Sequence, residues 1–156
     1  MQEPPLRVTA PTGWEISLSQ AASNAATREF LQAVQEALVH YRIAAADRIN
    51  AELLLAEVLN NVVKHAFAES QEGGISTSIH VADGHLQCCV LDRGQALKAF
   101  AALMQAPQEV QQPKMPNLPE GGFGWVIIRQ LAQEIDYRRA DGQNRLTFTM
   151  PFHGAG

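Results

Sequence analysis

Residues 57–65 have the sequence EVLNNVVKH, and the spacing of their apolar side chains predicts a largely buried helix. At roughly 100° per residue, one narrow wedge of this helix collects the polar side chains, which are Glu57, Asn60, Asn61 and Lys64. Asn is a poor residue for a helix interior, so two in succession indicate a requirement other than helix stability. A carboxylate one turn from an amide oxygen suits a hard cation, and a lysine suits phosphate. A solvated stripe on an ordinary amphipathic helix remains the alternative.

Two downstream segments place glycine beside features of a binding site. Asp92 and Gly94 directly follow a predicted buried strand, although a plain strand-to-loop turn is the simpler explanation of that pattern. Residues 121–124, GGFG, precede an apolar helix, so their N–H groups and the helix N-terminus could bind an anion. A hinge or tight turn is the competing interpretation. The segment is not a Walker loop, because no Gly-Lys-Ser/Thr follows it, and it lacks the preceding strand of a dinucleotide fingerprint.

The order of the predicted elements favours an α+β fold. Helical periodicity covers residues 24–41 and 47–68, and shorter helices are expected at 97–104 and 125–132. Alternating apolar residues and turn residues predict hairpins within 6–18, between 75–81 and 86–91, and between 135–139 and 146–150, the last two turned at Asp83-Gly84 and Asp141-Gly142. This order predicts a two-layer α/β sandwich, with helices on one face of a mixed, mostly antiparallel sheet.

Composition narrows the class of protein. A length of 156 residues with 46% hydrophobic residues fits a single domain, residues 1–156, with a core of its own. The net charge of −4 and the scattered Lys and Arg argue against direct binding of nucleic acid or of an anionic membrane. No apolar run is long enough to cross a bilayer. Cys88 and Cys89 are adjacent in a predicted strand and point to opposite faces, so a reduced, cytoplasmic chain is expected.

Taken together and in this order, the three polar segments resemble the motifs of the Bergerat-fold, or histidine kinase-like, ATPases. The stretch from Glu57 to Ala66 resembles the asparagine box of that family, Asp92-x-Gly94 resembles its first glycine box, and Gly122-Phe123-Gly124 resembles its second. The compact length, the Lys-His-Ala-Phe ending of the helix and the run GGFGWVIIRQL at 121–131 are similar to one branch in particular, the anti-sigma-factor serine kinases.

The resemblance implies a nucleotide-binding role for each matching residue. Asn61 would hold Mg²⁺ through its side-chain oxygen, and Lys64 would place a positive charge near the phosphates of ATP. Asp92 would accept a hydrogen bond from the adenine amino group, and Gly94 would let the base lie close to the backbone. Gly122-Phe123-Gly124 would form the phosphate-binding segment.

The resemblance also implies a partner-switching regulator of transcription. Glu57 would be the general base for a protein hydroxyl, in a phosphoryl transfer that depends mainly on positioning and charge neutralisation. The protein would sequester a sigma factor and phosphorylate an anti-sigma-factor antagonist on serine or threonine, as a homodimer. The proline-rich stretch at about 97–120 would be a flexible lid over the ATP.

The sequence departs from the family pattern at Ala96, which stands where the first glycine box has its second glycine. Alanine is tolerated there only if the backbone is not left-handed. Two alternatives to a serine/threonine kinase stay open. One, which Ala96 favours, is a non-catalytic, ATP-dependent module that only sequesters its partner. The other is a histidine-kinase catalytic domain without a phospho-accepting helix.

Overall fold

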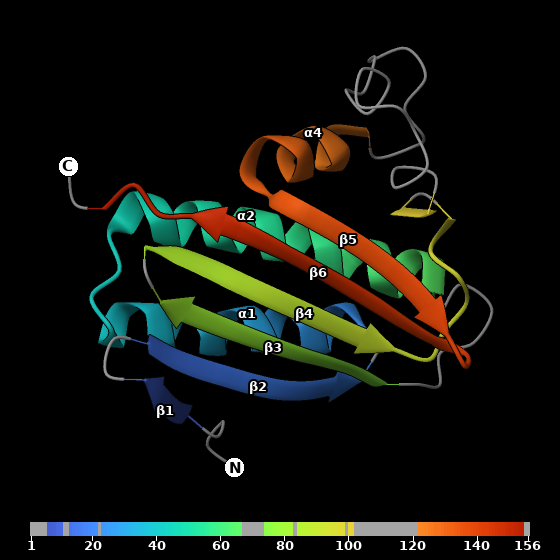
Figure 1. Ribbon diagram of the computed structural model, residues 1–156, viewed down its shortest axis with the longest axis horizontal. Coiled ribbons are helices and arrows are strands. Elements are labelled where there is room, and N and C mark those ends of the chain that lie inside the picture. The colour runs from blue at the N-terminus through green and yellow to red at the C-terminus, as the bar shows by residue number, and fades with distance from the viewer. Residues whose placement is uncertain are drawn as a thin grey trace.

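The framework of the protein is a six-stranded sheet with helices on one face (Figure 1). The computed structural model describes residues 6–10, 13–21, 23–66, 74–82, 84–98, 100–101 and 122–154. In chain order, the elements are β1 (Leu6–Ala10), β2 (Gly13–Ala21), α1 (Asn24–His40), α2 (Ala45–Asn61), a π-helical turn (Val62–Ala66), β3 (Gly74–Ala82), β4 (His85–Asp92), α4 (Gly122–Leu131), β5 (Gln133–Ala140) and β6 (Gln143–Pro151).

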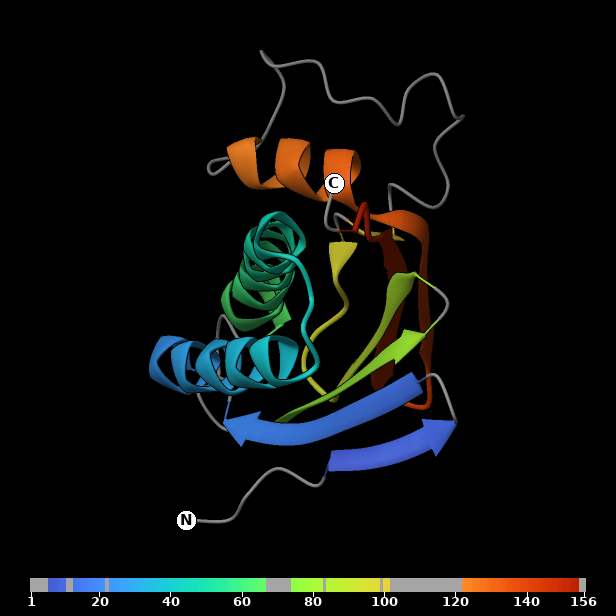
Figure 2. The ribbon, with the colours of Figure 1, turned by 90° about the vertical axis from the view of Figure 1, so that its left-hand side faces the viewer.

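The strands lie in the order β1-β2-β3-β4-β6-β5, and every neighbouring pair of them is antiparallel. In Figure 2 the two long helices, α1 and α2, form a second layer over one face of this sheet. The predicted α+β sandwich is therefore confirmed, with a sheet that is antiparallel throughout its described strands.

Alternating burial along the strands explains why the two layers hold together. In β3, β4 and β6 every second side chain is buried, and these side chains form one core with the inner faces of α1 and α2. Leu38, Leu54 and Leu55 are fully buried on the helix side of that core, as are Ile79 and Leu86 on the sheet side. Burial of such side chains is the main stabilising contribution in a domain of this size.

Several element boundaries differ from those predicted. The predicted helix 47–68 is an α-helix only to Asn61 and continues as a π-helical turn, while the predicted helix 125–132 begins earlier, at 122. The hairpin turn at Asp141-Gly142 is confirmed, because φ is 54° at Asp141 and 74° at Gly142, as a two-residue primed turn requires. Strand β6 begins at 143 rather than 146.

Most of the predicted lid lies outside the part of the chain that the structure describes. Residues 99 and 102–121 are not described, so the predicted helix 97–104 is visible only at its start, where the N–H of Ala101 donates to the carbonyl of Leu97 at 3.0 Å. Among the helices that are described, none combines the length and the apolar character needed to span a membrane.

Candidate functional site

Glu57 and Gly124 are far apart in sequence but close in space. They belong to α2 and α4, two helices that pack against each other (Figure 2). Gly124 is buried, and a Cβ atom added to it would lie 3.2 Å from Cδ of Glu57 and closer still to Oε2. The Glu57 carboxylate therefore lies against the backbone of the first turn of α4, where the helix dipole favours a negative charge. Glycine at this position leaves room for the carboxylate.

Asn61 lies one turn after Glu57 and directs its amide oxygen away from the helix. Its Nδ2 donates to the backbone carbonyl of Glu57 at 2.8 Å, so the nitrogen is turned toward the helix and Oδ1 remains as an acceptor. An amide oxygen is a ligand that suits Mg²⁺. Within the described ranges no three His, Cys, Asp or Glu side chains cluster around a possible metal position. The fit to a cation therefore depends on Asn61 together with oxygens that a nucleotide would bring.

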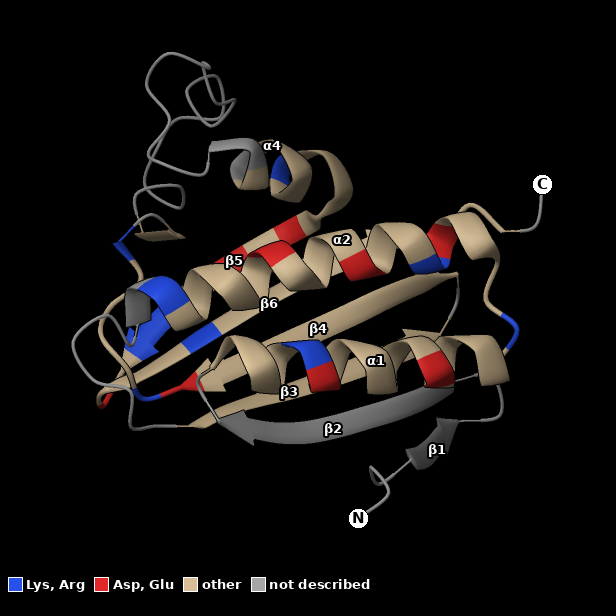
Figure 3. Ribbon diagram, turned by 180° about the vertical axis from the view of Figure 1, so that it is seen from behind, with Lys and Arg blue, Asp and Glu red and all other residues tan. Residues whose placement is uncertain are grey.

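Lys64 is exposed on the π-helical turn at the end of α2. Lys and Arg gather at this end of the molecule, where α2 ends and the β5–β6 hairpin turns (Figure 3). Arg93, Arg138 and Arg139 are exposed there as well. Arg138 is paired with Asp136 at 2.8 Å, so Lys64, Arg93 and Arg139 are the cations at this end that could meet a phosphorylated ligand.

Asp92 is a buried carboxylate at the end of β4, with a relative exposure of 3%. Its Oδ1 accepts hydrogen bonds from the N–H of Gly94 at 2.9 Å and from Nδ2 of Asn144 at 2.8 Å. Its Oδ2 is buried and accepts no hydrogen bond from any described residue. Burial raises the pKa of Asp92, while the hydrogen bonds from Asn144 and Gly94 and the charge of Arg139 act in the opposite direction. A ligand that donates to Oδ2 would complete the coordination of this carboxylate.

The loop after Asp92 accommodates the departure at Ala96. The described non-glycine residues with positive φ are Arg42, Glu134 and Asp141, so the backbone of Ala96 is not left-handed. Gly94 donates its N–H to Asp92 and accepts a hydrogen bond on its carbonyl from Nη1 of Arg139 at 2.9 Å. Alanine in the last place of this box is therefore compatible with the observed loop.

Sequence reasoning missed a group of side chains on β5 and β6 that holds this loop. Asn144 is fully buried and pairs with Asp92 in the register of β4 and β6, and it bonds to Tyr137 and Arg139 on β5. The signal along the chain is that Asn144 is in phase with the inward-facing apolar residues of its strand, but this alternation does not show that Asn144 faces Asp92. The predicted strand began at 146, so this position fell outside it.

The structure thus arranges the predicted residues in two groups. One contains Glu57, Asn61 and Gly124 at the packing of α2 and α4, and the other contains Asp92 and Gly94 at the end of β4. The C-terminal end of α2 and the end of β4 lie at the same end of the molecule in both Figure 1 and Figure 3. Gly122 and Phe123 begin α4, but the side chain of Phe123 lies outside the described part.

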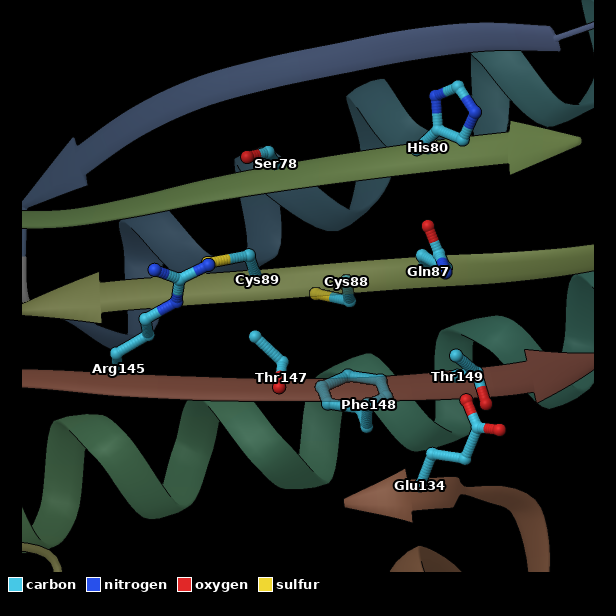
Figure 4. Close-up of a pocket in the computed structure, with 10 residues that line it drawn as sticks. All are labelled: Ser78, His80, Gln87, Cys88, Cys89, Glu134, Arg145, Thr147, Phe148 and Thr149. Atoms are coloured by element: carbon cyan, nitrogen blue, oxygen red, sulfur yellow. The ribbon is translucent and has the colours of Figure 1, made fainter. Parts of the chain in front are cut away.

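A separate hollow of about 420 Å³ lies on the open face of the sheet, away from the helices (Figure 4). Its lining comes from β3, β4, β5 and β6 and consists of Ser78, His80, Gln87, Cys88, Cys89, Glu134, Arg145, Thr147, Phe148 and Thr149. None of the predicted site residues is among them. The hollow is therefore distinct from the two groups at the end of the molecule.

Comparison with known proteins identifies relatives of this chain. The model of the histidine kinase-like ATPase domain matches residues 20–150. The serine/threonine-protein kinase BtrW of Bordetella bronchiseptica is 29% identical over 108 residues, 69% of this chain and 73% of that protein. The serine-protein kinase RsbW of Oceanobacillus iheyensis is 25% identical over 85 residues, 54% of this chain and 53% of that protein.

A solved structure shows the same fold. The crystal structure of the RsbU and RsbW domains of a Mycobacterium tuberculosis protein superposes with a TM-score of 0.58 at 18% sequence identity, over 88% of this chain and 32% of that one. This chain thus spans about half the length of the RsbW relative and a third of the solved chain. The chain belongs to the histidine kinase-like ATPase domain family and is distantly homologous to the RsbW and BtrW serine kinases.

Proposed function

We propose that this chain binds ATP with Mg²⁺ and is an anti-sigma factor that phosphorylates its antagonist protein on serine or threonine. The observation that carries the proposal is Asp92, a buried carboxylate whose Oδ2 accepts no hydrogen bond from the described chain. A buried acceptor without a donor is destabilising, so a donor on a ligand is expected. The adenine amino group is such a donor. The relatives named as serine and serine/threonine kinases support transfer to a protein hydroxyl.

The remaining nucleotide contacts are proposed for residues at the start of α4, at the end of α2 and on the π-helical turn that follows α2. The backbone N–H groups of Gly122 and Gly124 belong to the first turn of α4, where anions bind favourably. Lys64 adds a positive charge on the π-helical turn that follows α2. Asn61 is the proposed ligand of Mg²⁺, which when bound neutralises charge on the phosphates.

Glu57 is the proposed general base. Its carboxylate lies against Gly124, which belongs to the turn proposed to hold the phosphates, so it would face the transferred group. The serine or threonine hydroxyl of the antagonist would give its proton to Glu57 as its oxygen forms a bond to the γ-phosphorus. The bond from that phosphorus to the bridging oxygen breaks, and ADP leaves.

The Glu57→Gln variant tests the kinase. We expect it to bind ATP as wild type does and to transfer label from radiolabelled ATP to a candidate antagonist at least 100-fold more slowly, since a general base typically contributes 10²–10⁴-fold. The matched control is Glu52→Gln, an exposed position on the same helix. Transfer retained by Glu57→Gln would place the base elsewhere.

Titration with ATP, with and without Mg²⁺, tests the metal assignment. Asn61→Ala should lose the Mg²⁺-dependent part of the affinity, whereas Asn60→Ala, an exposed neighbour on α2, should keep it. A Mg²⁺ dependence that is the same in both variants would contradict the role of Asn61.

The second candidate is a non-catalytic module that uses ATP only to hold its partner. The sequence feature that favours it is the departure from the first glycine box at Ala96, although the observed loop accommodates alanine there. ATP binding and partner binding without any transfer of label would support it. The kinase is further proposed to be a cytoplasmic homodimer, and a monomer in sedimentation equilibrium at micromolar concentration would rule out the dimer.

A further inference from the structure

Asn144 on β6 uses its whole side-chain amide in one buried network. Its Nδ2 donates to Oδ1 of Asp92 at 2.8 Å and to the carbonyl of Gln95 at 2.7 Å. Its Oδ1 accepts from the hydroxyl of Tyr137 and from Nη1 of Arg139, the latter at 2.9 Å. A carboxamide has two N–H donors and two acceptor sites, so all of its capacity is used here. The orientation of the amide is therefore fixed, because a flip would place its oxygen against Oδ1 of Asp92 and the carbonyl of Gln95, and its NH₂ group against Nη1 of Arg139.

The same network holds the loop that follows Asp92. Arg139 donates from Nη1 to the carbonyl of Gly94 at 2.9 Å, and Asn144 donates to the carbonyl of Gln95. The hydroxyl of Tyr137 accepts from the N–H of Leu97 at 2.9 Å. Three side chains of the β5–β6 hairpin thus bind three backbone groups between 94 and 97. The end of β4 and this loop are thereby joined to the hairpin as one unit.

The network also determines which oxygen of Asp92 is offered to a ligand. Oδ1 receives two donors, from Asn144 and from the N–H of Gly94, while Oδ2 is buried and meets no donor in the described ranges. Rotation of the carboxylate would break both bonds to Oδ1. Asp92 therefore presents Oδ2 in one direction, with the geometry set by Asn144 rather than by Asp92 alone.

We propose that Asn144 is the positioning residue that sets selectivity for a base carrying an exocyclic amino group, by fixing Asp92 and the loop 94–97 in one arrangement. This rests on the proposed function, because it takes Asp92 to meet the base. A fixed acceptor favours an amino group and opposes a carbonyl oxygen at the same position of the purine. Pre-organisation makes that preference strong, because the acceptor does not have to be ordered when the base binds.

The test compares ATP with the triphosphate of purine riboside, which lacks the amino group, by titration in the presence of Mg²⁺. Wild type is expected to bind ATP at least ten-fold more tightly, as for a hydrogen bond to a charged group. In Asn144→Ala the ratio of the two dissociation constants should fall toward one. A merely structural role would weaken both ligands by the same factor and leave this ratio unchanged, which would overturn the proposal.

Two further variants keep the test decisive. Tyr137→Phe removes one hydroxyl but retains the ring that lies 6.3 Å from that of Phe100, centroid to centroid, and should lower the ratio to a smaller extent. If Asn144→Ala does not fold, Tyr137→Phe alone tests the proposal. Arg145→Ala, the next residue on β6 and on the opposite face, should leave the ratio as in wild type. A wild-type ratio near one would overturn the proposed function itself, whereas a large ratio unchanged in Asn144→Ala and Tyr137→Phe would overturn only the role of Asn144.

Discussion

Asp92→Asn is expected to reverse the preference of the site from a donor to an acceptor on the base. Two donors, the N–H of Gly94 and Nδ2 of Asn144, converge on Oδ1 of Asp92. In the variant these two donors require the amide oxygen at the position of Oδ1, because an NH₂ group at that position would place a donor against both of them. The NH₂ group must then occupy the position of Oδ2, the acceptor that the described chain leaves without a donor.

The magnitude follows from the bond that is lost. A hydrogen bond to a charged group contributes about 1.5–3 kcal/mol, so affinity for ATP should fall by roughly 10- to 150-fold. Inosine triphosphate, with a carbonyl in place of the amino group, should bind the variant better than it binds wild type. Titration of both proteins with both nucleotides measures this exchange. A variant that prefers ATP by the same factor as wild type would refute the proposed orientation of the site.

The same substitution has a predicted effect on stability. Burial raises the pKa of Asp92 above its ordinary value, so the folded chain holds this proton more tightly than the unfolded chain does. The ionised carboxylate therefore destabilises the folded state. This destabilisation is complete at a pH above the raised pKa of the folded chain and absent at a pH below the ordinary pKa of the unfolded chain. At pH 7 we therefore expect the free energy of unfolding of Asp92→Asn to be higher than that of wild type. Urea unfolding should show this difference shrinking as the pH falls toward the ordinary carboxyl pKa.

Two more predictions concern other parts of the fold. Gly124→Ala should retain or slightly raise the melting temperature, because alanine favours a helix by about 0.5–1 kcal/mol over glycine. The same variant should transfer the phosphoryl group about 100-fold more slowly, because its Cβ displaces the Glu57 carboxylate. Transfer rates that are equal in Gly124→Ala and wild type would show that phosphoryl transfer does not require the observed position of the Glu57 carboxylate. Asp47→Ala should lower the free energy of unfolding by about 1–3 kcal/mol, because Asp47 is buried and its two oxygens accept from the backbone N–H groups of residues 153 and 154 at 3.0 Å. Hydrogen exchange at those two amides should become faster, and an unchanged rate would contradict the contact.

Local residue types explain why much of the fold could be predicted from the sequence. Asp141-Gly142 determines its turn because only a few residue types accept positive φ in succession. The start of α1 at Asn24 was predicted as well, and there the side chain of Ser23 accepts from the N–H of Ala26 at 3.1 Å. Such positions depend on neighbours in sequence, so the sequence contains the necessary information.

The parts that were not predicted depend on neighbours in space. The 100° spacing that placed Lys64 on the wedge of Glu57 and Asn61 assumes a regular α-helix, but a π-helical turn begins directly after Asn61 and changes the rotation per residue. Asn144 was missed because its importance comes from the register that pairs it with Asp92, and no pattern along the chain states that register.

The two groups of site residues are held by different physical means, and this difference predicts different consequences of mutation. On the sheet side, Asp92 is fixed by hydrogen bonds that extend through Asn144 to β5, and these allow few alternative arrangements. On the helix side, the Glu57 carboxylate occupies space beside Gly124 at the end of a side chain that can rotate. Substitutions in the sheet network should therefore alter which base is bound, whereas substitutions between α2 and α4 should alter the rate of transfer with little change in selectivity. A variant of Asn144 that changed only the rate, or of Gly124 that changed only the selectivity, would contradict this division.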